Sequence, residues 1–183
     1  MIRWFVMIFT GVVLGGIVHL VTILYLPRTA SVDAYARIAP IAPVNAMTPL
    51  PQPTPEKALM PFMDPAFAGA VCRYDLSAGP MKLTAPVSQA YTSVSFYTRY
   101  GVPYYAINDR AAGRRVIELD LMTPAQHAQV PEDEEVTAAD RLIVESPTLT
   151  GLILVRALAP EPSLMAMAQR AVAGATCAIQ PNP

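Results

Sequence analysis

The first 26 residues contain the feature that most constrains this chain. From Trp4 to Leu26 no Lys, Arg, Asp or Glu interrupts the run WFVMIFTGVVLGGIVHLVTILYL, and Arg3 and Arg28 bracket it. A helix of this length rises by about 1.5 Å per residue and spans roughly 35 Å, more than the hydrocarbon core of a bilayer at about 30 Å. We therefore predict a transmembrane anchor over residues 1–28.

A cleaved signal peptide is the alternative for this segment. Signal peptides carry an apolar region of about 7–15 residues followed by small residues at the cleavage site. This run is longer, and the A-x-A pattern at Ala34-Tyr35-Ala36 lies eight residues beyond its end. The length of the apolar run and the distance of this pattern from it both favour an uncleaved anchor.

One face of the predicted anchor carries small and polar residues. Gly11 and Gly15 form a G-x-x-x-G pattern, and His19 follows one turn later on the same face. Such spacing lets helix backbones approach closely, and polar groups in lipid usually face a partner. We expect contact with lipid and with a neighbouring helix, which could belong to a second copy of the chain. The alternative for His19 is a neutral side chain without a partner.

Two cysteines, Cys72 and Cys177, lie near the two ends of the region after the anchor. An even pair closing most of a domain predicts a disulfide and an oxidising compartment, with two buried free thiols as the alternative. The positive charges on the two sides of the anchor are nearly balanced. From the cysteines we predict a single-pass protein of a bacterial inner membrane, with its C-terminal domain in the periplasm.

The segment 29–56 is rich in proline and nearly free of charge. Proline removes a backbone donor and favours extended polyproline-like geometry. We predict a semi-rigid linker there and a β-rich periplasmic domain over residues 57–183. Residues 31–38 could form a short interfacial helix.

The domain reads as an α+β fold, mainly an antiparallel β sheet with short marginal helices. Period-two alternation and turn residues predict these strands: 91–99, 102–107, 115–121, 141–145 and 151–158. Capping residues predict these helices: 64–71 after Asp64, 123–129 opened by Thr123-Pro124, and 164–177 after Ser163. Consecutive strands without a long helix between them favour antiparallel pairing.

No catalytic residue, metal site or cofactor is predicted. His19 lies in the predicted anchor and His127 outside it, so the two cannot form one zinc or catalytic site. The net charge of −1 argues against a nucleic-acid partner. The acidic run 132–135 lacks the alternating ligands of a calcium loop, and we expect a solvated loop there.

A cluster of tyrosines and arginines supplies the candidate binding residues. Tyr97 and Arg99 share a face of their predicted strand, and Tyr105 on the next strand could lie opposite them. Such a face can line a pocket or a protein interface, with ordinary cross-strand packing as the alternative. We add Asp109 as a possible pocket residue and Arg156 on a later strand.

The region from about 62 to 177 resembles the bacterial domain-of-unknown-function 1254 family. The resemblance rests on four stretches: Tyr74-Asp75-Leu76 with Gly79-Pro80-Met81, the strand YTSVSFYTR from Tyr91, Tyr105-Ala106-Ile107-Asn108-Asp109, and Ser146-Pro147-Thr148 leading to Arg156. In longer family members this domain is followed by a second one, catalogued as 1214. This chain ends where the second domain would begin, so the resemblance implies a separate 1214-type partner. It implies no reaction.

Two functions compete on this basis. The first is a membrane-tethered periplasmic binding or assembly module that pairs with a membrane or periplasmic protein. The second is a subunit of an envelope enzyme acting on a small molecule. The sequence shows no nucleophile and base together, which favours the first.

Overall fold

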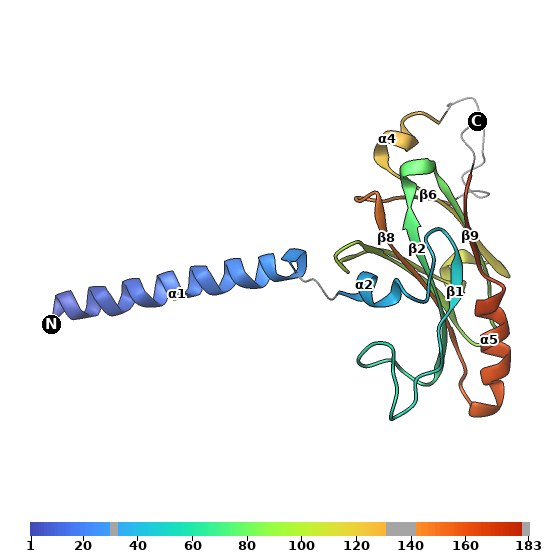
Figure 1. Cartoon of the computed structure of the whole chain (residues 1–183), viewed down its shortest axis with the longest axis horizontal. Helices are drawn as coiled ribbons and strands as arrows, with labels where there is room; N and C mark the ends of the chain where they lie inside the picture. The colour runs from blue at the N-terminus through green and yellow to red at the C-terminus, as the bar shows by residue number, and fades with distance from the viewer. Residues whose placement is uncertain (30–32, 131–141, 181–183) are drawn as a thin grey trace. The chain divides into compact units, whose positions relative to one another are not determined.

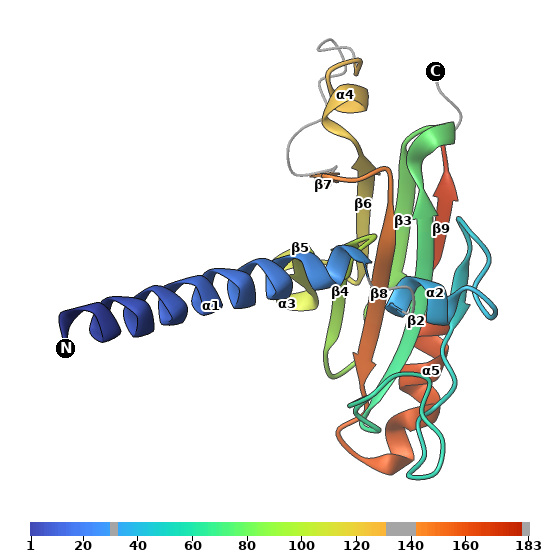
Figure 2. The ribbon, with the colours of Figure 1, turned by 60° about the vertical axis from the view of Figure 1, so that its left-hand side comes forward.

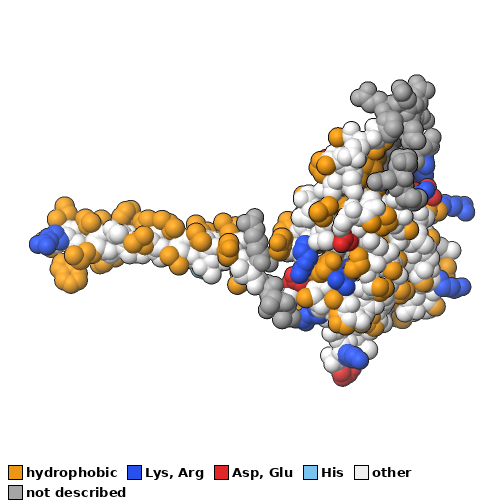
Figure 3. All heavy atoms as spheres, turned by 45° about the horizontal axis from the view of Figure 1, so that its top comes forward, with side chains coloured by type: hydrophobic (Ala, Val, Ile, Leu, Met, Phe, Trp, Pro, Cys, Tyr) orange, Lys and Arg blue, Asp and Glu red, His pale blue; other side chains and the backbone are white. Residues whose placement is uncertain are grey.

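The computed structural model describes residues 1–29, 33–130 and 142–180. It divides into two compact units, Met1–Asp33 and Ala34–Pro183. The first unit is the helix α1 (Ile2–Thr29), whose surface is covered by apolar side chains along its length (Figure 3). Its stretch Ile2–Leu26 is long and apolar enough to cross a membrane, as an anchor or as a signal sequence.

The second unit contains two β sheets (Figures 1 and 2). The first, here sheet A, has the strand order β1 (Met47–Pro49), β2 (Phe67–Asp75), β8 (Thr150–Leu158), β4 (Thr92–Thr98) and β5 (Pro103–Asn108). The second, sheet B, has the order β7 (Leu142–Glu145), β6 (Val116–Met122), β3 (Met81–Pro86) and β9 (Thr176–Ile179). The short helices are α2 (Ala34–Ile38), α3 (Asp109–Ala112), α4 (Pro124–His127) and α5 (Met165–Ala173), with 3-10 turns η1 (Leu76–Ala78) and η2 (Pro162–Leu164).

One apolar core lies between the two sheets. Alternate residues of each strand enter it, because side chains of a strand point to its two faces in turn. The buried members are these: Ala70, Cys72, Tyr74, Val94, Phe96, Ile153 and Val155 from sheet A, and Met81, Leu83, Ile117, Leu119, Leu121 and Cys177 from sheet B. Helix α5 adds Ala168 and Val172 to the same core, and it lies toward the end of the domain opposite α4 (Figures 1 and 2).

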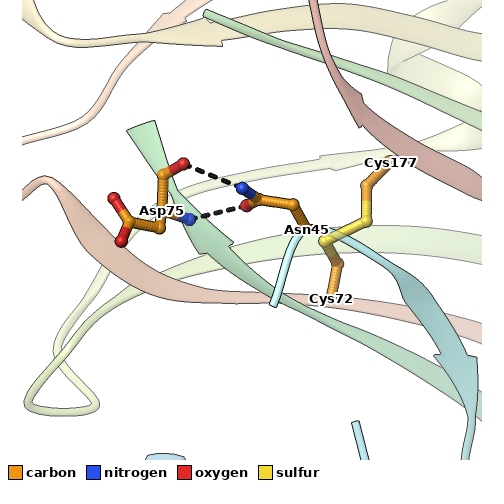
Figure 4. The surroundings of a disulfide bond; sticks show 4 residues. All are labelled: Asn45, Cys72, Asp75 and Cys177. Atoms are coloured by element: carbon orange, nitrogen blue, oxygen red, sulfur yellow. Dashed lines mark hydrogen bonds between the residues drawn. A yellow bond between two sulfur atoms is a disulfide. The ribbon is translucent and has the colours of Figure 1, made fainter. Parts of the chain in front are cut away.

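The predicted disulfide between Cys72 and Cys177 is present. It joins β2 of sheet A to β9 of sheet B, so it crosses the core between the sheets (Figure 4). Beside it, the Asn45 side chain accepts a hydrogen bond from the Asp75 backbone N–H at 2.7 Å and donates one to the Asp75 carbonyl at 3.1 Å. This amide bracket fixes the chain before β1 against the end of β2.

The predicted fold class is confirmed. The sheets are antiparallel except for β6 and β7, which pair in parallel. The strands predicted over 91–99 and 102–107 form the antiparallel pair β4 and β5, and Gly101 between them has a positive φ of 78° that suits glycine. Thr123 opens α4 with a complete capping box shared with Gln126, as the Thr-Pro pattern predicted.

The helix predicted over 64–71 is wrong. Residues 67–75 form β2, which pairs with β8 along its whole length. The Asp64 signal is real but local, because its carboxylate accepts the Ala66 backbone N–H at 2.9 Å in a tight turn. The small residues that follow are compatible with either structure, and the pairing with β8 decides between them.

The helix predicted over 164–177 is shorter than expected. Ser163 lies in η2 and does not cap α5, which begins at Met165 and has no side-chain cap. The helix ends at Ala173, and Cys177 lies in β9. Strand β3, between Pro80 and the final Pro86, was not predicted, although it occupies a central place in sheet B.

The segment predicted as a free linker is in large part folded onto sheet A. The compact unit begins at Ala34 instead of residue 57. Ile38 and Ala42 are buried with Val71 and Leu152 on the outer face of sheet A. The prolines do not prevent this, because β1 is an edge strand that ends at Pro49, and the next hydrogen bond to β2 is donated by the Leu50 N–H to the Gly69 carbonyl at 2.8 Å.

We expect the disulfide to contribute substantially to stability, because it closes a loop with a sequence separation of 105. The Cys72→Ala/Cys177→Ala double variant should lose about 2–5 kcal/mol of unfolding free energy. Urea denaturation followed by circular dichroism measures this loss. Wild-type protein under reducing conditions is the control and should unfold at the same midpoint as the variant, and equal midpoints for variant and oxidised wild type would contradict the prediction.

Candidate functional site

The predicted tyrosine–arginine face is divided by the sheet. Phe96 pairs directly with Tyr105 across β4 and β5, and its ring lies 5.8 Å from the Tyr105 ring on the core side. Tyr97 is the next residue along β4 and packs on the outer face of sheet A. Tyr97 and Tyr105 therefore lie on opposite faces, and the expectation that they lie opposite each other on one face is wrong.

Arg99 takes part in an arrangement that the sequence did not predict. The Tyr35 ring of α2 has the guanidinium carbons of Arg73 and Arg99 over it, each 4.3 Å from the ring centroid. Arg73 also donates from Nη1 to the Ala42 carbonyl at 3.1 Å. Two cation–π contacts and this hydrogen bond hold α2 and the turn after it on sheet A. Nothing in the local sequence joins Tyr35 to Arg73, so only the structure reveals the pair.

A cluster of hydroxyl groups lies around Tyr74, on the core side of β2. The Tyr74 hydroxyl lies 2.9 Å from Ser146 Oγ and 3.1 Å from the Tyr104 hydroxyl, and it donates to the Tyr97 carbonyl at 3.3 Å. Burial raises the pKa of Tyr104 above its ordinary value. The Tyr104 hydroxyl therefore stays neutral, and the three hydroxyls serve as mutual hydrogen-bond partners, which explains why buried polar groups are tolerated there.

Gly151 is required by this hydroxyl cluster. It pairs directly with Tyr74 in the ladder between β2 and β8. A Cβ at residue 151 would overlap the Tyr74 phenol and the Tyr97 carbonyl oxygen. The absence of a side chain lets the tyrosine ring cross over β8.

Ser146 does not belong to a catalytic arrangement with its neighbours. The adjacent Glu145 points outward, where its carboxylate lies 2.6 Å from His127 Nδ1. Ser146 itself is buried, and its Oγ donates to the Thr148 carbonyl at 2.7 Å. The side chains of His127 and Glu145 are both about half exposed, so this surface contact has little effect on stability.

Asp109 is the predicted residue that lines a cleft. It begins α3, and its Oδ1 accepts the Thr92 backbone N–H at 3.2 Å. The cleft encloses about 510 Å³ and is lined by Val87, Ser88, Gln89, Asp109, Gly113, Arg114 and Arg115. Neither Arg99 nor Tyr105 lines it.

Arg156 lies on the outer face of sheet A and is not among the residues that line the cleft. Its guanidinium carbon is 5.6 Å from the centroid of the Phe67 ring. The strand register places it directly between Gly69 and Ser93. The predicted binding residues thus occupy three places: the outer face of sheet A, the core side of β5, and the cleft at α3.

The other predicted sites are distributed as follows. Gly11, Gly15 and His19 share α1, and a Cβ at either glycine would meet nothing within 4 Å in the single chain. The acidic run 132–135 lies outside the described residues. Within the ranges that are described, no group of three or more His, Cys, Asp or Glu residues is placed to hold a metal ion.

The sequence pattern of the family described as "Protein of unknown function (DUF1254)" matches residues 44–178. The chain belongs to the domain-of-unknown-function 1254 family. The family match begins at Val44, inside the segment that precedes β1, which agrees with the folding of this segment onto the domain. A comparison with curated proteins finds no match.

Two solved structures resemble this member of the 1254 family. The crystal structure of the VPA0106 protein from Vibrio parahaemolyticus aligns with a TM-score of 0.55 at 13% identity, over 75% of this chain and 30% of that chain. A putative uncharacterized protein from Burkholderia cenocepacia aligns with a TM-score of 0.49 at 15% identity, over 79% and 36% of the two chains. The Vibrio structure shows the same fold, and this chain spans about a third of the length of either protein.

We predict that the ring of Tyr35 holds α2 on sheet A. The Tyr35→Ala variant removes both cation–π contacts and should lower the unfolding free energy by about 1–2 kcal/mol. It should also speed proteolytic cleavage between residues 34 and 60. Tyr35→Phe keeps the ring and is the matched control, which should behave like the wild type in urea denaturation and limited proteolysis. Equal stability of the Ala and Phe variants would refute the role of the ring.

Proposed function

We propose that the protein is a membrane-tethered periplasmic module that binds a partner protein, and that the partner is a separate 1214-type domain protein. One surface supports this proposal. Tyr100, Val102 and Leu149 are large apolar residues that are 46%, 54% and 55% exposed. Adjacent apolar residues that remain in water are typical of protein contact sites.

These three residues lie at one end of sheet A. Tyr100 and Val102 belong to the turn between β4 and β5. Leu149 immediately precedes β8, whose Gly151 pairs with Thr98 at the end of β4. Strand pairing therefore brings the three residues to the same end of sheet A, which we call the apolar end.

Several of the chemically capable side chains in the described residues have structural tasks, which favours binding over catalysis. Tyr74 forms hydrogen bonds with Tyr104 and Ser146 on the core side of the sheet. Arg73 and Arg99 stack on Tyr35. The choice of partner comes from the family resemblance, in whose longer members a 1214-type domain follows this one.

The membrane placement is supported by α1 and the disulfide. The helix is long enough to span a bilayer, and a disulfide persists in an oxidising compartment such as the periplasm. The A-x-A pattern that could direct cleavage, Ala34-Tyr35-Ala36, lies in α2, and Tyr35 is held by two arginines. Cleavage there would remove a packed residue, so retention of α1 as an inner-membrane anchor is the better proposal. Tethering in one membrane would also raise the effective concentration of a weak partner.

A subunit of an envelope enzyme acting on a small molecule is the second candidate. The cleft beside Asp109 favours it, since about 510 Å³ falls within the range of small-molecule sites. Among the lining residues no nucleophile is paired with a base, so the cleft by itself supports binding.

The topology can be tested with reporters fused to the C-terminus. Alkaline phosphatase folds only after export, so its fusion should be active and a cytoplasm-active reporter should be silent. N-terminal sequencing of protein extracted from membranes should begin within the first residues of the chain. Activity of the cytoplasmic reporter alone would reverse the topology, and a new N-terminus after Ala36 would replace the anchor by a signal peptide.

The partner contact can be tested by changing the apolar end. The Val102→Glu/Leu149→Glu double variant places two charges in the proposed interface and should reduce co-purification of a co-expressed 1214-type protein by about tenfold or more. Met167→Glu is the matched control, because Met167 is also an exposed apolar residue but lies on α5. Circular dichroism and thermal melting should show that both variants remain folded.

Several outcomes would decide against this proposal. A folded double variant that retains the partner would exclude the apolar end. A Gly11→Leu/Gly15→Leu variant that loses the partner instead would move the contact to the anchor. A purified, partner-free protein that converts a small molecule would favour the enzyme.

A further inference from the structure

The cleft beside α3 lies between two connections of the chain. Ser88 and Gln89 come from the connection between β3 and β4, and Gly113 and Arg115 from the connection between β5 and β6. Asp109, at the start of α3, also lines the cleft and belongs to the same connection as Arg115. None of these positions takes part in the apolar end proposed for partner binding.

The walls of the cleft are fixed by hydrogen bonds to the backbone. The Val87 N–H donates to the Arg115 carbonyl at 2.9 Å and ties the two connections together. The Thr92 N–H donates to Asp109 Oδ1 at 3.2 Å, and Ser88 Oγ donates to the Tyr91 carbonyl at 3.0 Å. The cleft is therefore preformed, and a ligand would not have to order the loops around it.

Helix α3 is held at both ends, which fixes the position of Asp109. Asn108 accepts the Ala111 N–H at 2.9 Å as the N-cap. Gly113 closes the helix in the left-handed region with a φ of 62°, and its N–H donates to the Asp109 carbonyl at 3.1 Å. Asp109 therefore lines the cleft from a short, doubly capped helix.

The lining carries groups of both signs that are open to water. The Arg115 guanidinium is exposed and bonds to no acidic group in the part of the chain that the structure describes. Asp109 keeps Oδ2 available, because its described hydrogen bond uses Oδ1. Gln89 is exposed beside them and can donate or accept.

The presence of Arg115 and Asp109 in one cleft favours ligands of a particular chemical class. A guanidinium binds a carboxylate with charge-assisted hydrogen bonds. An ionised carboxylate accepts hydrogen bonds and cannot donate them, so Asp109 would bind a hydroxyl or an ammonium group of the ligand. We propose that the cleft binds a small organic acid that carries a hydroxyl or amino group beside its carboxylate, with the acid group on Arg115 and the donor on Asp109.

Three acids with the same carbon skeleton test this proposal. Propionate, lactate and alanine differ only in carrying hydrogen, hydroxyl or ammonium at the α carbon. Binding to the full-length protein in detergent can be measured by titration calorimetry and by thermal melting at constant ionic strength. Lactate or alanine should bind about tenfold more tightly than propionate, because a hydrogen bond to a charged group is gained.

Variants assign the two roles separately. Arg115→Gln should weaken all three acids by about tenfold or more, whereas Asp109→Asn should remove the advantage of lactate or alanine and leave propionate unchanged. Arg156→Gln is the control, because Arg156 is also an exposed arginine but lies on the outer face of sheet A. Wild-type melting curves in sodium chloride give the baseline.

The outcomes separate this inference from the proposed partner contact. Failure of all three acids to bind, or an equal loss for Arg115→Gln and Arg156→Gln, would overturn the cleft site. Intact acid binding in the Val102→Glu/Leu149→Glu variant would support two independent surfaces. Loss of selectivity in Asp109→Asn with the same melting temperature as the wild type would confirm the contact rather than a change in folding.

Discussion

Three consecutive residues of β2 hold the layers of the domain together. Cys72 points into the core and is bonded to Cys177 in sheet B. Arg73 points outward and holds Tyr35 and the Ala42 carbonyl. Tyr74 points inward again, and its hydroxyl forms hydrogen bonds with groups at the ends of β4, β5 and β7. Because a strand alternates its faces, one short stretch of β2 can bind both neighbouring layers.

That arrangement depends on the ladder between β2 and β8. Tyr74 can cross β8 only because its direct partner is Gly151, where a side chain would overlap the phenol. The ladder places nine residues of β2 against nine of β8, so a shift by one residue would send all three side chains to the wrong faces. The hydroxyl cluster, the disulfide and the attachment of α2 are therefore specified together by one register.

The sequence predicts best what short-range signals determine. The apolar run predicts α1, alternation predicts the strands β4 and β5, and the Thr123-Pro124 pattern predicts α4. The strand β2 was predicted as a helix because small residues after Asp64-Pro65 suit both structures, and its partner β8 lies far along the chain. The candidate binding residues lie in three separate places for a similar reason. The opposite faces of Tyr97 and Tyr105 follow from the register, whereas the contact of Tyr35 with Arg73 depends on how residues 34–60 fold back.

The two surfaces proposed for binding lie at the two ends of β4. Its first residue, Thr92, is bonded to Asp109 in the cleft, and its last, Thr98, precedes the turn of the apolar end. Six steps of about 3.3 Å separate Thr92 from Thr98, so roughly 20 Å of rigid strand lies between the two surfaces. A small acid in the cleft and a protein at the apolar end would therefore not compete for space. Coupling between them would have to pass along β4, whose neighbours β8 and β5 hold it on both sides.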